Sequence, residues 1–354
     1  MAVYTTIDDP SVFFQAELYT GTGSSNAVTL DGATNLSPAI LWLHNRSSAE
    51  GPDIYDVIRG VTSRMRTNGN GVESDQSANS VSAIGSDGFT VLTNSSVNTD
   101  GDLYVAYCWK AGTTSGIGTS GQNITPSGYS INTTSKIGIY AYTGNGTDDS
   151  QINHGLGVTP NFMIVKSRSL DNNWTVFHRK NTSAPETDYL VLNTTIATAD
   201  TDTVWSDQLP DTTDFTLGSG SGVNTSGATY VAYLFADVQG YSKFGGYTGN
   251  GNADGTFVYT GFRPAFLMIK RTATAENWHI YDSEREGYNQ ANDYLRANSN
   301  TSEDGSDGHL DILSNGFKSR HTDVGINASG DNYVYAAFAE APFVNSNGVP
   351  CNAR

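Results

Sequence analysis

Cysteine is nearly absent from this sequence of 354 residues, and cationic side chains are scarce. The two cysteines, Cys108 and Cys351, are too few for a disulfide framework and leave the redox compartment open. The chain has 19 Lys and Arg against 36 Asp and Glu, which gives a net charge of -17. Phosphate binding needs clustered cations, so this balance argues against nucleic acid as a partner, and an anionic membrane surface would repel the chain.

Long hydrophobic runs are also missing. No apolar run approaches the length of about 18 residues that crosses a bilayer, and residues 1–10 lack the basic and apolar regions of a secretory signal. Apolar residues make up only 37% of the chain, but aromatic residues reach 11%, which is too many for a disordered protein. We therefore expect a folded chain with no membrane segment and with enough large side chains for two or three cores.

The motifs of common catalytic sites do not occur. The chain has no nucleophile elbow, no Walker loop, no His-Glu-x-x-His motif and no Cys-x-x-Cys pair. Residues 144–146 and 249–251 read Gly-Asn-Gly, as at the start of a dinucleotide loop, but the third glycine is misplaced and hairpin turns explain both. A glycosidase pair stays open, because only the fold sets the distance between two acids. We predict no catalytic residue, no cofactor-binding residue and no enzymatic activity.

One sequence unit occurs three times. Each copy opens with Tyr-Thr-Gly, has a proline that leads two residues later into an apolar run, and closes with an aromatic strand. The opening tyrosines are Tyr19, Tyr142 and Tyr247, the prolines are Pro38, Pro160 and Pro264, and the closing tyrosines are Tyr104, Tyr230 and Tyr333. The opening and closing tyrosines are 85, 88 and 86 residues apart. The constant order and spacing indicate an internal repeat.

The unit has the composition of β-structure. Its apolar runs are short, rich in Val, Ile, Tyr and Phe, and bounded by turn pairs such as Asn145-Gly146 and Asn315-Gly316. Only residues 53–59 and 283–294 show a helical pattern. We therefore predict an all-β protein of tandem β-sandwich, jelly-roll-like domains in three pseudo-repeats.

The repeat also predicts the domain organisation. The second and third domains are connected by only the short segment 237–243, which predicts that they pack rigidly. The Gly/Ser/Thr-rich stretch before the second domain is typical of a linker. The predicted boundaries are an N-terminal docking segment at 1–16, sandwich repeats at 17–110, 137–238 and 239–343, the linker at 111–136 and a C-terminal tail at 344–354.

Calcium is the ion that the sequence favours most. Residues 250–255 reproduce the alternating oxygen ligands of an EF-hand opening, which makes Asn250, Asn252 and Asp254 candidate Ca²⁺ ligands. The twelfth position is Gly261 instead of the bidentate glutamate, and Asx-turns explain the pattern as well. Residues 98–102 and 304–308 form similar clusters.

Histidine and tryptophan offer further candidates with ordinary alternatives. A metal or general-base role is open for any histidine, but they lack close ligand spacing, and solvent-facing or capping roles fit better. The histidines are His44, His154, His178, His279, His309 and His321. Trp174 and Trp278 occupy equivalent positions in two repeats. They would either stack on sugar rings or fill a core, and the repeated strand position favours the core; Trp42, inside an apolar run, is also expected to be buried.

Several longer motifs carry a family resemblance. They are residues 4–11 (YTTIDDPS), 109–112 (WKAG), 154–160 (HGLGVTP) and 338–343 (FAEAPF). With them the chain resembles, over almost its whole length, an uncharacterised repeat domain of structural, tail-fibre-like proteins of marine tailed bacteriophages. That resemblance implies no agreed activity and no site residues.

The resemblance implies a structural component of a virion: a tail fibre, a head fibre or a capsid-surface decoration that contributes to host-surface adhesion. Such a protein assembles in the host cytoplasm and then lies on the particle surface, with other virion proteins as partners and as a symmetric homo-oligomer. The alternative is a carbohydrate-binding or glycan-depolymerising phage module whose partner is a host surface glycan.

Overall fold

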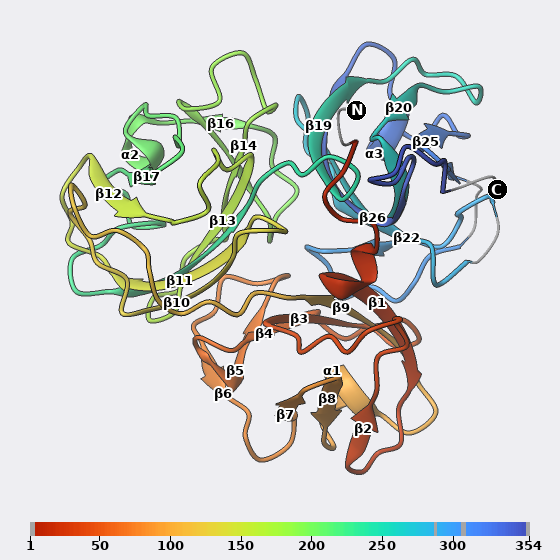
Figure 1. Cartoon of the computed structure of the whole chain (residues 1–354), viewed down its shortest axis with the longest axis horizontal. Coiled ribbons are helices and arrows are strands. Elements are labelled where there is room, and N and C mark those ends of the chain that lie inside the picture. Colours follow the sequence, from red (N-terminus) through yellow and green to blue (C-terminus); the bar gives the residue numbers. More distant parts are fainter. Residues whose placement is uncertain (1–3, 287–288, 306–308, 352–354) are drawn as a thin grey trace.

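The computed structural model describes residues 4–286, 289–305 and 309–351, and these residues form three lobes around a common centre (Figure 1). Each lobe contains one large antiparallel sheet and one small sheet. Lobe 1 comprises residues 14–109, lobe 2 residues 128–235 and lobe 3 residues 242–342. The predicted all-β class with sandwich-like packing of antiparallel sheets is confirmed.

Lobe 1 has a six-stranded sheet in the order β1-β9-β3-β4-β5-β6 and a small sheet β2-β8-β7. Its strands are β1 (Phe14–Thr20), β2 (Asn26–Val28), β3 (Ile40–Asn45), β4 (Asp53–Asp56), β5 (Gly60–Arg66), β6 (Ser74–Asp75), β7 (Val81–Gly85), β8 (Gly88–Val91) and β9 (Leu103–Trp109). The 3-10 helix η1 (Pro10–Val12) precedes β1, and the helix α1 (Ser95–Asn98) precedes β9.

Lobes 2 and 3 follow the same plan. Lobe 2 has the sheets β10-β11-β18-β13-β14-β15-β16 and β12-β17, and lobe 3 has β19-β26-β21-β22-β23 and β20-β25-β24. Lobe 2 contains β10 (Gly128–Asn132), β11 (Ile137–Thr143), β12 (Ser150–Asn153), β13 (Phe162–Ser167), β14 (Thr175–His178), β15 (Asp188–Val191), β16 (Ala199–Asp200), α2 (Asp202–Trp205), β17 (Asp214–Leu217) and β18 (Thr229–Phe235). Lobe 3 contains β19 (Ser242–Thr248), β20 (Phe257–Tyr259), β21 (Phe262–Arg271), β22 (Trp278–Asp282), β23 (Leu295–Arg296), β24 (Leu310–Leu313), β25 (Gly316–Ser319), α3 (Val324–Asn327) and β26 (Asn332–Pro342).

The strands β3, β13 and β21, inside the three large sheets, are buried on both faces, which explains the continuous apolar runs of the sequence. In β3, Ile40 and Trp42 point to the centre of the molecule, whereas Leu41 and Leu43 pack against the small sheet of the same lobe. Successive strand residues point to opposite faces, so one run supplies two cores.

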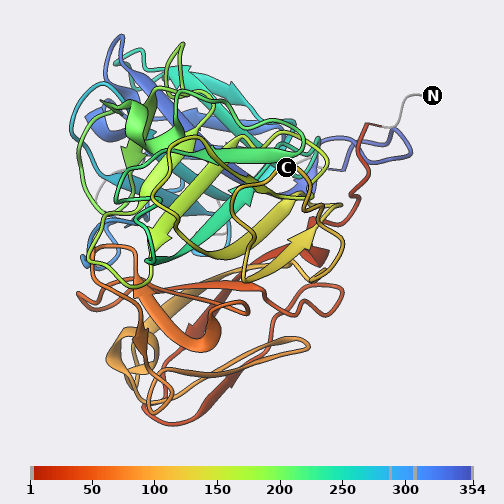
Figure 2. The same ribbon diagram turned by 90° about the vertical axis from the view of Figure 1, so that its left-hand side faces the viewer.

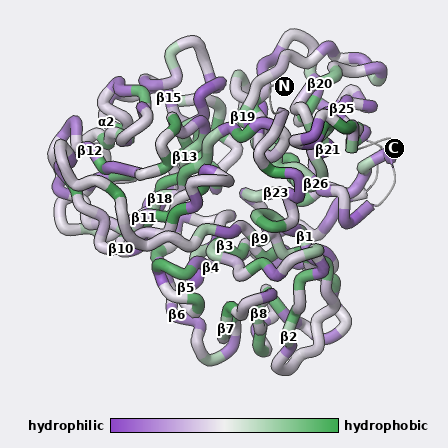
Figure 3. The backbone as a smooth tube through the Cα atoms, in the orientation of Figure 1, coloured by the Kyte–Doolittle hydropathy of each residue, from purple (hydrophilic) through white to green (hydrophobic). Residues whose placement is uncertain are grey.

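The central core belongs to all three lobes. Equivalent residues of the three closing strands, Trp109, Phe235 and Phe338, meet pairwise with ring centroids 5.5 to 6.4 Å apart. A cavity of about 40 Å³ lies here, lined by residues of every lobe. Figure 3 shows the apolar segments concentrated where the large sheets face one another. The three units therefore share one core besides their own, an arrangement that independent domains in series would not have.

Two connecting segments are part of this packing. In the stretch 111–136, where we predicted a linker, the residues Ile124 and Ile131 are buried in the core of lobe 2 and β10 adds a strand to its sheet. Near the N-terminus, Phe14 stacks on Phe338 of lobe 3 at 5.4 Å, and the Thr5 hydroxyl donates to the Gln239 carbonyl at 2.7 Å. Figure 2 shows the N-terminal segment crossing to lobe 3.

The two helices predicted from periodicity are wrong. Residues 53–56 form β4, and the described part of 283–294 contains turns and isolated bridges. The physical reason is an Asx-turn: Asp56 accepts the N–H groups of Ile58 and Arg59 at 2.9 and 2.8 Å, which ends the strand and folds the chain back. Among the described residues, no helix is long and apolar enough to cross a membrane.

Candidate functional site

Buried ionic clusters lie at two of the seams where lobes meet. At the seam between lobes 1 and 2, Asp56 accepts from Arg59 and, at 2.6 Å, from the Tyr233 hydroxyl of lobe 2. Glu73 of lobe 1 contacts Arg59 at 3.1 Å and receives two hydrogen bonds from Arg168 of lobe 2, at 2.8 and 3.0 Å. Each of these buried charges thus has a partner, and two of the contacts cross the seam.

The seam between lobes 3 and 1 repeats this cluster with equivalent residues. Asp282 accepts from Arg285 and, at 2.7 Å, from the Tyr107 hydroxyl of lobe 1. Glu303 contacts Arg285 at 2.9 Å and Arg46 of lobe 1 at 2.8 and 2.9 Å. Burial alone would raise the pKa of Glu303, but the hydrogen bonds and charges of Arg46 and Arg285 lower it. The glutamate is therefore held ionised at the seam.

The seam between lobes 2 and 3 has a neutral group at the same place. His178 occupies the β14 position that corresponds to Asp56 and Asp282. Its Nδ1 accepts the Lys180 N–H at 3.1 Å, so the ring proton lies on Nε2, which donates to the Tyr335 carbonyl of lobe 3 at 3.0 Å. Burial lowers the pKa of His178 to about 4, which keeps the imidazole neutral at pH 7.

One backbone hydrogen bond recurs at all three seams with a length of 2.9 Å. The pairs, donor first, are Glu73 to Arg168, Thr198 to Thr272 and Glu303 to Arg46. Each lobe thus meets the next through the same surface, and lobe 3 closes onto lobe 1. This is the geometry of a ring with heterologous contacts, built here within one chain.

Two histidines and an aspartate come together at the outer side of lobe 3. The hairpin β24–β25 pairs Leu310 with Ser319, which places His309 beside the chain that leads to His321. Asp323 follows as the N-cap of α3. One ligand-type atom from each of these three side chains lies within 4.8 Å of the other two, and His309 is buried whereas the other two are half-buried.

Each of the three side chains is also oriented by a contact of its own. The Nδ1 of His309 lies 2.9 Å from the Tyr281 hydroxyl, and the Nδ1 of His321 accepts the Asp323 N–H at 3.0 Å. The carboxylate of Asp323 accepts the Gly325 N–H at 2.6 Å. The contacts of His309 and Asp323 can persist with a metal bound, as second contacts of metal ligands do, whereas that of His321 cannot. Metal binding through the Nε2 of His321 would move its proton to Nδ1 and release one hydrogen bond, at a cost of about 1 kcal/mol.

A third histidine lies next to the aspartate. His279 is buried on β22, and its Nδ1 has no hydrogen-bond partner among the described residues. A Cβ added to Gly325 would lie 2.7 Å from this nitrogen and 2.8 Å from the Asp323 carboxylate, so the two groups flank one point. Burial lowers the pKa of His279 to about 3, and the ring is neutral at pH 7. Only glycine fits at position 325 beside it.

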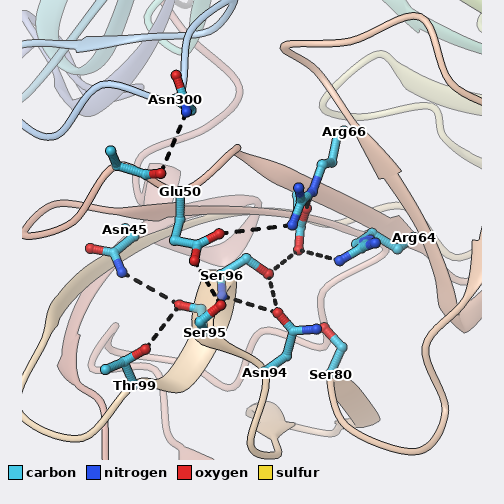
Figure 4. A network of polar contacts seen from close by, with 12 residues as sticks. Asn45, Glu50, Arg64, Arg66, Ser80, Asn94, Ser95, Ser96, Thr99 and Asn300 are labelled. Atoms are coloured by element: carbon cyan, nitrogen blue, oxygen red, sulfur yellow. Dashed lines mark hydrogen bonds and ion pairs between the residues drawn. The ribbon is translucent and has the colours of Figure 1, made fainter.

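Lobe 1 fills the equivalent place differently (Figure 4). Asp53 stands at the β4 position of His279, and Ser96, at the position of Gly325, donates to it at 2.5 Å. Burial raises the pKa of Asp53, while Arg64 and Arg66 oppose the shift. The same pocket thus holds a paired carboxylate in lobe 1 and imidazoles in lobe 3.

The sequence prediction missed the His309, His321 and Asp323 cluster because it compared histidine spacings along the chain. The available signal was Asn315-Gly316, a hairpin turn that brings positions about six residues on either side together. Five of the six histidines are buried, so the expectation of solvent-facing roles is wrong for them, and only His321 is half-exposed. The expected capping role is confirmed for His154, His178 and His321, each of which accepts the backbone N–H of the residue two positions on.

The three predicted calcium ligands have partners within the protein. Asn250 and Asn252 accept the N–H groups of Asn252 and Asp254 at 3.0 and 2.9 Å, which are Asx-turns. The exposed Asp254 carboxylate forms ion pairs with Lys318 and, at 3.7 Å, with Arg320, and these pairs lower its pKa. Calcium binding here stays a prediction.

The two similar clusters are used in turns and ion pairs where they are described. Asn98 is buried and accepts the Thr22 N–H at 2.8 Å, and Asp304 pairs with Arg296 at 3.3 Å. Residues 306–308 of the second cluster lie outside the described residues.

The prediction that Trp174, Trp278 and Trp42 are core residues is confirmed, since all three are buried. Two of them also join lobes. The Nε1 of Trp174 donates to the Arg66 carbonyl of lobe 1 at 3.0 Å, and that of Trp278 to the Val191 carbonyl of lobe 2 at 2.9 Å. Neither ring is available to stack on a sugar.

A family model described as "domain of unknown function (DUF7483)" matches residues 9–342, which span all three lobes. No curated protein matches the chain.

Proposed function

The chain belongs to the family of the domain of unknown function DUF7483, and we propose that it is a structural component of a bacteriophage virion. Its place would be the particle surface, as a tail fibre, head fibre or capsid decoration that contributes to host adhesion. The observation that carries the proposal is the closed ring of lobes, in which Trp109, Phe235 and Phe338 form one core. Such a body suits a virion part, which must stay folded outside the cell.

The seams add to this argument. Ionic clusters and buried tryptophans join each lobe to the next, so no lobe can detach without exposing charges and apolar surface. A cooperative body of this kind resists local opening, which is the route to proteolysis. The motifs at residues 4–11 and 338–343, which carry the phage resemblance, include the N-terminal segment that crosses to lobe 3 and part of β26.

Immunolabelling of purified phage particles tests the proposal. Antibodies raised against the folded protein should bind intact particles at one type of location in electron micrographs, and the protein should co-purify in a fixed ratio to the major capsid protein. Particles that carry no label, with the protein found only in the lysate of infected cells, would refute the structural role.

One surface feature supports the second candidate, a glycan-binding module. Phe257 and Tyr259 on β20 are 45% and 53% exposed and, being two residues apart, point to the same side of the strand. Tyr259 also borders a cavity of about 390 Å³ whose lining includes the polar residues Asp237, Gln239 and Lys243. Aromatic faces beside polar groups suit sugar rings.

A glycan array separates the two candidates. Under the glycan hypothesis the protein binds a defined host polysaccharide, and Tyr259→Ala reduces the binding at least tenfold. Leu209→Ala, which removes another exposed apolar side chain in lobe 2, is the control and leaves the binding unchanged. An array without signal would leave the structural role as the sole candidate.

A further inference from the structure

We propose that His309, His321 and Asp323 bind a divalent transition-metal ion, with Zn²⁺ as the best fit. Two imidazoles and a carboxylate are ligands that zinc and its neighbours prefer, whereas calcium takes oxygen ligands only. The three groups lie within 4.8 Å of one another although 12 to 14 residues separate His309 from the other two. The fold therefore assembles the cluster; sequence proximity does not.

The three ligands come from two structural elements. His309 lies directly before β24. Its backbone carbonyl accepts the N–H of Arg320, on the neighbouring segment after β25, at 2.8 Å. His321 and Asp323 lie on the segment between β25 and α3. A bound ion would therefore join the start of the hairpin to the segment that leaves it, and would tie the small sheet of lobe 3 to α3.

The positions of the ligands allow an ion to enter and to be held. His321 and Asp323 are half-buried and open to solvent, and His309 forms the buried floor of the site. Zinc bonds of about 2.0 to 2.2 Å bring ligand atoms to about 3.3 Å from one another, so the two outer side chains would move inward by about an ångström. These are the two side chains with room to do so.

The surroundings fit a metal that keeps an open coordination position. Three protein ligands leave a fourth place for water or for another side chain. His279, whose Nδ1 lacks a partner among the described residues, flanks Asp323 beside Gly325 and offers a further imidazole nitrogen next to the site. The stacked rings of Tyr294 and His309, with centroids 4.8 Å apart, cover the inner side.

The pocket in lobe 1 provides an internal comparison. There Asp53, Ser96 and Ser80 stand at the positions of His279, Gly325 and His309, and Arg64 and Arg66 already neutralise the carboxylate. The guanidinium groups of Arg64 and Arg66 thus stand in lobe 1 where a metal ion would compensate the carboxylate. We assign metal binding to lobe 3 alone.

Calorimetric titration of the metal-free chain with ZnCl₂ tests the proposal. One ion per chain should bind, and His321→Asn and Asp323→Asn should each weaken binding at least tenfold. Both changes keep the local fold, because asparagine can accept the Asp323 N–H at position 321 and can cap α3 at position 323. CaCl₂ at the same concentration should give no binding that depends on these two residues.

His154→Asn is the matched control. His154 accepts the Leu156 N–H on its Nδ1 in the same kind of turn, but its Nε2 meets the Asp211 carbonyl, and His154 belongs to no cluster of metal-ligand side chains in the part of the chain that the structure describes. Zinc binding to this variant should equal that of the unaltered chain. Absence of zinc binding, or equal binding by all three variants, overturns the proposal.

A measurement on the unaltered chain removes any dependence on variant folding. Zinc should protect His321, the half-exposed ligand, from modification by diethyl pyrocarbonate, as read by peptide mass spectrometry. Modification of His321 at the same rate with and without saturating zinc would also overturn the proposal.

Discussion

The three seams between the lobes use two different sets of buried side chains. Where lobe 1 meets lobe 2 and where lobe 3 meets lobe 1, a buried aspartate, an arginine and a tyrosine hydroxyl form the contact. Where lobe 2 meets lobe 3, His178 makes the contact through a single hydrogen bond to a carbonyl. The same backbone hydrogen bond joins the lobes at all three seams, and the side chains beside it differ in charge.

The comparison shows that a seam can close without a buried aspartate–arginine pair, since among the described residues the Lys270 ammonium of lobe 3 reaches only the Thr195 carbonyl of lobe 2 across this seam, at 3.0 Å. A buried ion pair returns little net stability, because its attraction offsets a large desolvation cost, but loss of one partner is severe. The ionic seams are therefore sensitive to mutation, and the neutral seam is sensitive to acid, since its key group is an imidazole kept neutral by burial.

Removal of an arginine from an ionic seam should have the largest effect on the free energy of unfolding. Arg285→Ala leaves the buried Asp282 without its cation and should lower the free energy of unfolding by about 3 to 5 kcal/mol. Asn181 stands at the equivalent place of the neutral seam, where Asn181→Ala should cost about 1 kcal/mol. Urea denaturation of both variants measures the difference, and equal losses would remove the distinction between the seams.

Acid should weaken the neutral seam through His178. The pKa of His178 is about 4 in the folded chain and near 6.5 when unfolded, so the unfolded state binds the proton over the range between these values. Stability is therefore complete above pH 6.5 and falls by about 1.4 kcal/mol per pH unit towards pH 4 on account of this group.

His178→Asn isolates this contribution from those of the other buried histidines. It should flatten the dependence of unfolding free energy on pH between 4 and 6.5 by the amount that His178 contributes. A control, Thr272→Ser, changes a side chain at the same seam that carries no titratable group, and it should leave the slope unchanged. An unchanged slope in the His178 variant would show that its proton affinity is not shifted by folding.

The tyrosine hydroxyls give a smaller test of the same seams. Tyr107→Phe and Tyr233→Phe each remove one hydrogen bond to a buried carboxylate and should cost about 2 kcal/mol. In the third closing strand the equivalent residue is Ala336, which has no hydroxyl to lose. Calorimetric unfolding should show similar losses for the two variants, and a loss for one alone would mean that the ionic seams are not equivalent.

Much of the fold follows from the sequence, because periodicity and turn pairs are local signals. The runs after Pro38, Pro160 and Pro264 are strands, and the tyrosines that open and close each unit stack in pairs, as Tyr19 and Tyr104 do at 5.0 Å. The shared core could not be predicted, because a continuous apolar run does not show which face of the strand that it forms packs against another lobe.

The candidate metal cluster could be predicted only in part. The turn at Asn315-Gly316 is local, but the approach of His321 to His309 depends on the strand register, and Asp323 joins through its role as an N-cap. The seam contacts cross between repeats more than a hundred residues apart, as with Tyr107 and Asp282, and no local pattern encodes them.

The smallest expected effect concerns the geometry of the bridging arginines. Arg46 and Arg168 each bind a glutamate of the neighbouring lobe through two nitrogens, and lysine cannot reproduce this fork. Arg46→Lys and Arg168→Lys should therefore each cost about 1 kcal/mol, less than removal of the charge, because one ion pair remains. Thr272, at the corresponding place of the neutral seam, contributes its carbonyl alone, so Thr272→Ser should change the unfolding free energy by less than either lysine variant. If the lysine variants were as stable as the unaltered chain, the arginine charge would suffice, and the paired hydrogen bonds would not distinguish the ionic seams from the neutral one.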